Sequence, residues 1–397
     1  MPLKNSDMSK FDYLTEELND LEATDMLRRL RCIESAQGPV VRFDDGREKI
    51  LFCSNNYLGL ADDDRIKEAV KKAVDKYGCG AAASRLVSGT MSPHVQAEKE
   101  FAEFFDKQAS LLFSSGWCAN QAVLKTLPKK GDLVLIDKLD HASIIDGALE
   151  ANAEFRTYRT DEPDRLEKYL ADESYNRKFI VTETVFSMDG CTADIKTLVD
   201  LKDKYDAILI VDEAHSAGCM GKTGAGLCEQ LGILDQVDIV IAPLGKAFAA
   251  NGCIVASSKA VVDYLINKAR GFVYTTAVSP VNCAAVLAGL DIIRSEPQRR
   301  KTLMENADHL RLNLQMAGMD IMDSTTHIVP VLIGKSHKAM EVSRKLFEQG
   351  FYAAAIRPPT VAKGTARLRV SVQYGHTKEQ IEKFAFTLQD VIASQKP

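Results

Sequence analysis

Short apolar runs alternate with longer amphipathic stretches through the middle of the chain. Several of these runs are nearly unbroken and of strand length, which is typical of strands covered on both faces. They are 111–113, 133–137, 179–183, 207–211 and 237–242. Because helix-length stretches separate most of them, the pattern predicts strands that alternate with helices in a mostly parallel, doubly wound sheet. The predicted fold class is therefore α/β.

The pattern is different at the two ends of the chain. Leu14, Leu18 and Leu21 have helical spacing, and residues 40–52 read as a hairpin around an Asp-Gly turn. Beyond about residue 285, two strands and two helices predict a smaller α+β domain; they are 327–333, 367–372, 338–349 and 381–392. We therefore expect an N-terminal helix and hairpin (1–50), a large domain (51–285) and a small C-terminal domain (286–397).

Composition narrows the functional classes. With 46% hydrophobic and 26% charged residues, the chain has the composition of a soluble globular protein. A net charge of -5 does not favour nucleic acid as a partner. The nine cysteines form no C-x-x-C pair, which favours reduced thiols and predicts no metal site. The first residues lack an apolar leader and no apolar run is long enough for a membrane span, so we expect a cytoplasmic protein.

Two of the apolar runs lead directly into groups that carry chemistry. Asp212 and His215 follow the run 207–211, and Lys246 follows the run 237–242. Ligands of open α/β sheets bind beyond the C-terminal ends of the strands. An acid, an imidazole and an amine at this edge suggest pyridoxal 5'-phosphate (PLP). Lys246 would form the Schiff base, Asp212 would pair with the pyridine nitrogen, and His215 would contact the 3'-oxygen.

Three further groups follow predicted strands. Gly116 and Trp117 lie between a strand and a helix, where free N–H groups and the helix dipole favour phosphate, although such junctions are common. His141 can stack on a planar cofactor, and a helix N-terminal position explains it almost equally well. Ser187 is a candidate donor.

A different phosphate motif competes with this interpretation. Residues 218–223 end in Gly-Lys-Thr, as a nucleotide-binding P-loop does. That motif requires glycine at position 216, which is Ser216 here, so nucleotide hydrolysis is a poor second hypothesis. A nicotinamide-linked oxidoreductase is also disfavoured, because no Gly-x-Gly-x-x-Gly opens a βα unit.

Four motifs together resemble the α-oxoamine synthases, which are fold-type I PLP-dependent transferases. They are VDEAH at 211–215, GKAF at 245–248, VFSMDG at 185–190 and SNNYLGL at 54–60. The resemblance runs from about residue 25 to the C-terminus. It implies a homodimeric acyltransferase that condenses an amino acid with an acyl thioester, both small molecules, and releases CO2.

Within that family, residues 355–369 are most similar to members that join L-alanine to a pimeloyl thioester in biotin synthesis. A member that uses glycine and acetyl-CoA, or another acyl donor, stays an alternative. The carrier of the acyl group, CoA or an acyl carrier protein, also stays open.

The resemblance implies roles for particular side chains. The Schiff-base lysine is Lys246, with Asp212, His215 and His141 as its catalytic neighbours. Further cofactor contacts are implied at Gly116, Trp117 and Ser187, and at Thr276 of the partner subunit. Substrate contacts are implied at Asn55 and Arg369 for the amino-acid carboxylate, and at Arg28 and Thr360 for the acyl group.

The chain departs from the family pattern at Pro243, three residues before the Schiff-base lysine. Members usually carry Thr or Ser there, and the hydroxyl binds the cofactor phosphate. Proline has neither a hydroxyl nor an N–H group. Two readings follow: the chain lacks one phosphate contact, or other donors complete the pocket. Ala249 also stands where glycine is usual.

Overall fold

The computed structural model describes residues 10–394, and its centre is a seven-stranded sheet. The strand order is β3-β9-β8-β7-β6-β4-β5. The strands are β3 (Ala109–Phe113), β4 (Leu133–Asp137), β5 (Glu154–Tyr158), β6 (Lys178–Glu183), β7 (Ile208–Asp212), β8 (Ile239–Pro243) and β9 (Cys253–Ser257). Every pairing is parallel except those of β9, which runs antiparallel to both neighbours. The predicted α/β fold with a mostly parallel sheet is confirmed.

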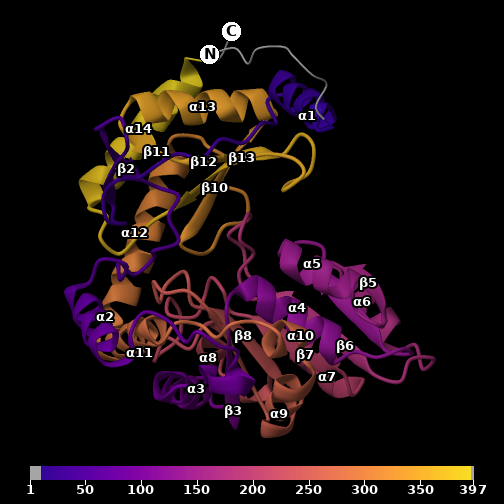
Figure 1. Cartoon of the computed structure of the whole chain (residues 1–397). Helices are drawn as coiled ribbons and strands as arrows, with labels where there is room; N and C mark the ends of the chain where they lie inside the picture. Colours follow the sequence, from indigo (N-terminus) through magenta and orange to yellow (C-terminus); the bar gives the residue numbers. More distant parts are fainter. Residues whose placement is uncertain (1–9, 395–397) are drawn as a thin grey trace.

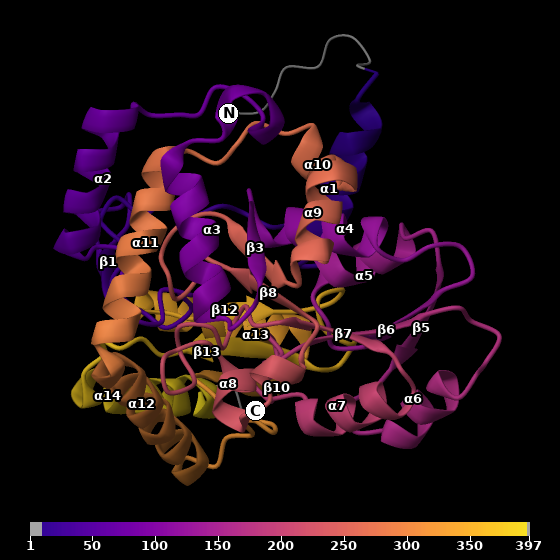
Figure 2. The ribbon, with the colours of Figure 1, turned by 90° about the horizontal axis from the view of Figure 1, so that it is seen from below.

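Helices cover both faces of this sheet, as Figure 2 shows. One face carries α4 (Gly116–Thr126), α5 (Ala142–Leu149), α9 (Lys259–Lys268) and α10 (Arg270–Val273). The other carries α3 (Ser92–Phe104), α6 (Pro163–Leu170), α7 (Ile195–Lys204), α8 (Leu227–Leu231) and α11 (Pro280–Ser295). Because side chains of a strand alternate between faces, Leu209 and Val211 enter one core and Ile210 enters the other. This double cover explains the unbroken apolar runs.

A smaller unit, drawn in orange and yellow, lies above the central sheet in Figure 1. Its antiparallel sheet has the order β10-β13-β12, with β10 (Ile328–Gly334), β12 (Ala354–Ile356) and β13 (Ala366–Ser371). Its helices are α12 (Pro297–Met316), α13 (Ser336–Glu348) and α14 (Lys378–Ala393). All six residues of β13 are buried, because this strand also faces the large unit through Arg367 and Arg369.

The N-terminal hairpin belongs with this smaller unit by strand pairing. The strands β1 (Val40–Arg42) and β2 (Glu48–Leu51) are antiparallel, and β2 pairs in parallel with β11 (Phe351–Tyr352). The predicted boundary at residue 285 falls inside α11, so the division into domains stays a prediction.

The remaining helices are α1 (Asp12–Ala23), α2 (Asp64–Tyr77), a π-helical turn (Arg85–Gly89) and a 3-10 turn (Leu234–Gln236). No residue of α1 is buried, although it forms where leucine spacing predicts a helix. Between residues 10 and 394, no helix has the length and hydropathy of a membrane span.

Candidate active site

Three neighbouring strands bring acidic and basic side chains to one edge of the central sheet. Asp212 ends β7 and pairs in register with Glu183 at the end of β6. Lys246 follows β8, and its Nζ lies 2.9 Å from Nε2 of His215. The predicted meeting of an acid, an imidazole and an amine is present in the structure.

Asp212 is 97% buried, and two donors hold its carboxylate. Asn120 of α4 donates to Oδ2 at 3.0 Å, and the amide of Ala214 donates to Oδ1 at 2.9 Å. Asn120 also donates to Ser143 Oγ at 2.9 Å, which joins α4, α5 and β7 around the acid. Burial raises the pKa of Asp212, while Lys246 and these two donors oppose the rise. A positive partner beside this carboxylate would favour its ionised form.

Burial also lowers the pKa values of the two basic groups of the site, Lys246 and His215. Desolvation lowers the pKa of Lys246, and the nearby carboxyl groups of Asp212 and Glu183 act in the opposite direction. Desolvation, followed by the positive charges of Lys246 and Arg369, lowers the pKa of His215 well below its usual value. His215 is therefore neutral at physiological pH, so one ring nitrogen carries a proton and the other accepts.

Glu183 is a site residue that the sequence interpretation missed. It is 99% buried, and its Oε2 has no hydrogen-bond partner in the described part of the chain. Desolvation and the charge of Asp212 raise the pKa of this carboxyl to about 8. The signal was present, because Glu183 ends an apolar run just as Asp212 does.

The turn before α4 has the features of an anion site. Ser115 caps the helix by accepting from the amide of Cys118 at 3.1 Å. Within residues 10–394, no hydrogen bond engages the amides of Gly116 and Trp117, which point from a helix N-terminus. A Cβ at Gly116 would lie 2.8 Å from Cγ of Pro243. Glycine is therefore required here, and Pro243 forms one wall of this turn.

Aromatic rings lie beside this turn. His141 caps α5, with Nδ1 2.8 Å from Ser143 Oγ. Its ring centroid lies 6.3 Å from that of Trp117, in an edge-on arrangement. The helix-capping role and a stacking role for His141 are compatible, because capping uses only Nδ1 and leaves the ring face uncommitted.

Arg369 joins the small unit to this site. Its Nε donates to the carbonyl of Ser187 at 2.7 Å, and its Nη2 lies 3.2 Å from both Asn55 Oδ1 and the hydroxyl of Tyr57. Arg369 is 93% buried, and no carboxylate forms an ion pair with it among the described residues. A buried cation without a counterion is suited to an anionic ligand.

The predicted acyl contacts form a separate group. Arg28 and Thr360 are both exposed, and Arg357 lies between their segments. Arg357 donates from Nη2 to the carbonyl of Leu27 at 3.2 Å, and its own carbonyl accepts from the amide of Thr360 at 3.2 Å. In the described chain, no hydrogen bond connects this group to Lys246.

Among residues 10–394, no hydrogen bond joins Lys246 to Thr276. It is exposed and forms an isolated antiparallel bridge with Ser84 at the surface. Its predicted contact requires a second subunit, so that role stays a prediction.

These residues fit PLP. The amides at Gly116 and Trp117 are open to a phosphate, and the glycine leaves room that a Cβ would fill. Asn120 Oδ1 and Glu183 Oε2 are buried polar atoms that have no partner within residues 10–394, as expected beside a polar ligand. A carboxylate, an imidazole and an amine supply the groups that bind a pyridine ring and an aldehyde.

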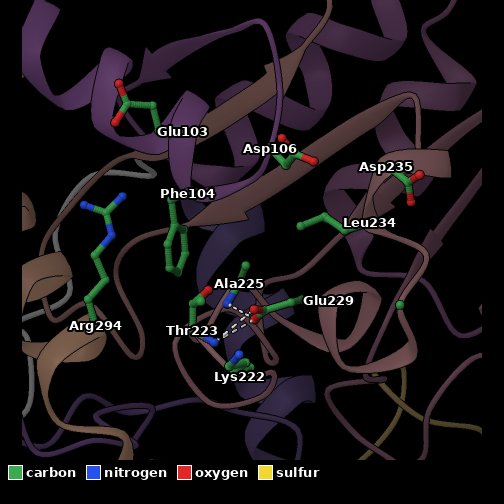
Figure 3. Close-up of a pocket in the computed structure, with 11 residues that line it drawn as sticks. Glu103, Phe104, Asp106, Lys222, Thr223, Ala225, Glu229, Leu234, Asp235 and Arg294 are labelled. Carbon is green, nitrogen blue, oxygen red and sulfur yellow. Dashed lines mark hydrogen bonds between the residues drawn. The ribbon is translucent and has the colours of Figure 1, made fainter.

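The Gly-Lys-Thr loop lies elsewhere, beside a surface pocket of about 700 Å³ (Figure 3). The carboxylate of Glu229 fills this loop by accepting from the amides of Thr223 and Ala225, each at 2.9 Å. The amides that a P-loop offers to phosphate are thus bound to a side chain of the protein itself. This arrangement supports the rejection of the P-loop hypothesis.

Comparison with known proteins identifies the class. The family model described as aminotransferase class I and II matches residues 47–388. A variant of serine palmitoyltransferase from S. paucimobilis, solved with a bound PLP–myriocin aldimine, superposes with a TM-score of 0.91 at 29% identity, covering 97% of this chain and 98% of that one. The chain belongs to the aminotransferase class I and II family. The predicted fold-type I architecture and the predicted cofactor, PLP, are confirmed.

Relatives with higher sequence identity to this chain indicate a more specific family within this class. The 8-amino-7-oxononanoate synthase of Geobacter sulfurreducens is 44% identical over 370 residues, which are 92% of this chain and 94% of that protein. A solved 8-amino-7-oxononanoate synthase from Francisella tularensis has a TM-score of 0.77 and 31% identity, over 89% of this chain and 99% of that one. The resemblance to acyltransferases of the α-oxoamine synthase family is confirmed.

Proposed function

We propose that this protein condenses L-alanine with a pimeloyl thioester to give 8-amino-7-oxononanoate, CO2 and the free thiol. The observation that carries this proposal is the 44% identity to a synthase of that name over nearly the whole of both chains. The site is consistent with the reaction, because Lys246, Asp212 and Arg369 lie where an amine, an acid and a carboxylate-binding cation are needed.

Each side chain has a distinct role in the proposal. When bound, PLP supplies an electron sink for the charge that remains after the amino acid loses its Cα proton. Lys246 would hold the cofactor covalently until the amine of the amino acid displaces it, and the freed lysine amine would then accept that proton, since its lowered pKa favours the neutral form. An ionised Asp212 would keep the pyridine nitrogen protonated.

The remaining site residues would bind and orient the reactants. Arg369 and Asn55 would hold the amino-acid carboxylate, and the amides at Gly116 and Trp117 would hold the phosphate. His141 would stack on the ring, with Ser187 as a further donor. Arg28 and Thr360 would contact the acyl group, and their position beside Arg357 supports a common binding region.

The proposed assembly is a cytoplasmic homodimer with the active site at the interface. Exposed apolar side chains of Leu86, Val87 and Tyr274 support a covered surface near Thr276. Thr276 of the partner subunit would then reach the cofactor phosphate. Nine unpaired cysteines support a reducing compartment.

The function is tested by assaying the purified protein with a panel of substrates. L-alanine, glycine and L-serine are each combined with pimeloyl-, acetyl-, succinyl- and palmitoyl-CoA, and release of the free thiol is measured. We expect the highest kcat/KM for L-alanine with pimeloyl-CoA and no turnover by Lys246→Ala. Pimeloyl-acyl carrier protein is then compared with pimeloyl-CoA to identify the carrier. A higher kcat/KM for glycine with acetyl-CoA would contradict the proposal and establish the alternative ligase activity.

A further inference from the structure

Tyr57 is placed at the junction of the two halves of the site. Its side chain is fully buried, and its hydroxyl oxygen lies 2.7 Å from His215 Nδ1, 2.9 Å from Asn55 Oδ1 and 3.2 Å from Arg369 Nη2. These three residues come from separate segments of the chain. One hydroxyl group therefore contacts both the predicted carboxylate site and the imidazole beside Lys246.

Packing fixes the position of this hydroxyl. The Tyr57 ring meets the His327 ring edge-on, with centroids 4.1 Å apart. His327 is fully buried, and neither of its ring nitrogens forms a hydrogen bond within the described chain. The two rings are thus held by close packing, so the hydroxyl cannot swing away from its three partners.

The donors and acceptors around the Tyr57 hydroxyl determine to which neighbour it donates and from which it accepts. A phenol supplies one hydrogen and two lone pairs, and Arg369 can only donate. Asn55 Oδ1 also accepts from Arg369, which fixes that amide with its oxygen toward Tyr57. The hydrogen and both lone pairs of the hydroxyl are used when Tyr57 donates to Asn55 Oδ1 and accepts from Arg369 Nη2 and His215 Nδ1. His215 then presents an unprotonated Nε2 to the amine of Lys246.

Burial keeps this arrangement available at neutral pH. Desolvation raises the pKa of Tyr57 to about 12, so the hydroxyl retains its proton. The cation of Arg369 opposes that rise, as expected for a donor held against the phenol oxygen.

We infer that Tyr57 is a positioning residue, which holds Asn55 and Arg369 in place for the amino-acid carboxylate. The inference rests on the proposed function for the identity of the substrate, L-alanine. The hydroxyl itself acts only through these neighbours.

The test compares Tyr57→Phe with Tyr158→Phe. Phenylalanine keeps the ring that packs on His327 and removes only the hydroxyl. Tyr158 is a matched control, because it is fully buried and its hydroxyl donates to the carbonyl of Val181 at 3.1 Å, in the core of the central sheet. Each cofactor-loaded variant is titrated with L-alanine and with ethylamine, which is alanine without its carboxylate, and binding is followed by the visible absorbance of the cofactor.

Tyr57→Phe is expected to weaken L-alanine binding about 10-fold, as for loss of a hydrogen bond to a charged group, and to leave ethylamine binding unchanged. The KM for the acyl thioester should also stay unchanged. Tyr158→Phe should change the binding of neither L-alanine nor ethylamine.

Equal weakening of L-alanine and ethylamine, or no change in either, would overturn the inference, since a merely structural role does not distinguish the two ligands. The titrations need no acyl donor. If the condensation assay fails while the two ligands are still distinguished, the proposed function is wrong and the positioning role stands.

Discussion

Replacing Glu183 with glutamine should change how the stability of the protein depends on pH. The carboxyl has a pKa of about 8 in the folded chain and an ordinary value of 4.5. A carboxyl whose pKa is raised by folding favours the protonated folded form. Its contribution to stability is full below about pH 4.5 and is lost as the pH rises toward 8.

The size of the stability difference follows from the difference between the two pKa values of Glu183. One pKa unit corresponds to about 1.4 kcal/mol, so the rise from 4.5 to about 8 corresponds to about 5 kcal/mol. Glutamine has a similar shape and no charge to bury, so it removes this term. Glu183→Gln should therefore be more stable than the parent by up to that amount above pH 8, and the difference should shrink toward pH 5.

Urea unfolding of the cofactor-free protein, followed by circular dichroism across this pH range, measures the difference. Glu173→Gln is the control, because Glu173 is exposed and its replacement also removes one carboxyl. Parallel stability profiles for the parent and Glu183→Gln would refute the reasoning, since they would show that Glu183 titrates alike in the folded and unfolded chains.

Two further substitutions test the cofactor contacts. Asp212→Asn should retain PLP and lose at least about 100-fold in kcat, because an amide cannot balance the charge on the pyridine nitrogen; near-normal turnover would remove Asp212 from the mechanism. Pro243→Thr should tighten PLP binding in equilibrium dialysis by about 10- to 100-fold, because it adds a hydroxyl beside the turn at Gly116. Unchanged or weaker binding would show that other donors already complete the phosphate pocket.

Local sequence patterns predicted the parts of the site that lie at strand ends. Asp212 and Lys246 could be found because each follows an apolar run, and the edge of a parallel sheet brings such positions together. Glu183 follows the same rule and could have been added. The strand β5 was missed because it is a half-exposed edge strand without an apolar run, whereas β9 is a buried apolar run and could have been added.

Contacts between distant segments could not be predicted in this way. Tyr57 and His215 are 158 residues apart, and Leu27 and Arg357 are 330 apart. No periodicity of either segment specifies its partner, because these contacts depend on how the small unit packs on the central sheet. The family resemblance indicates Asn55 and Arg369, whereas Tyr57 is only one residue of the motif at 54–60 and has no role implied by it.

The pairing of β2 with β11 has a consequence for the order in which the chain folds. Ile50 pairs with Phe351, so the N-terminal hairpin lacks its third strand until the ribosome has passed β11. All seven strands of the central sheet have been synthesised by Ser257. Contacts between such distant segments form slowly, and an unpaired strand edge is open to wrong partners. The nascent chain is therefore expected to complete its central sheet first. The edge of the hairpin stays unpaired for longer, so it is the segment that we expect to favour aggregation during translation.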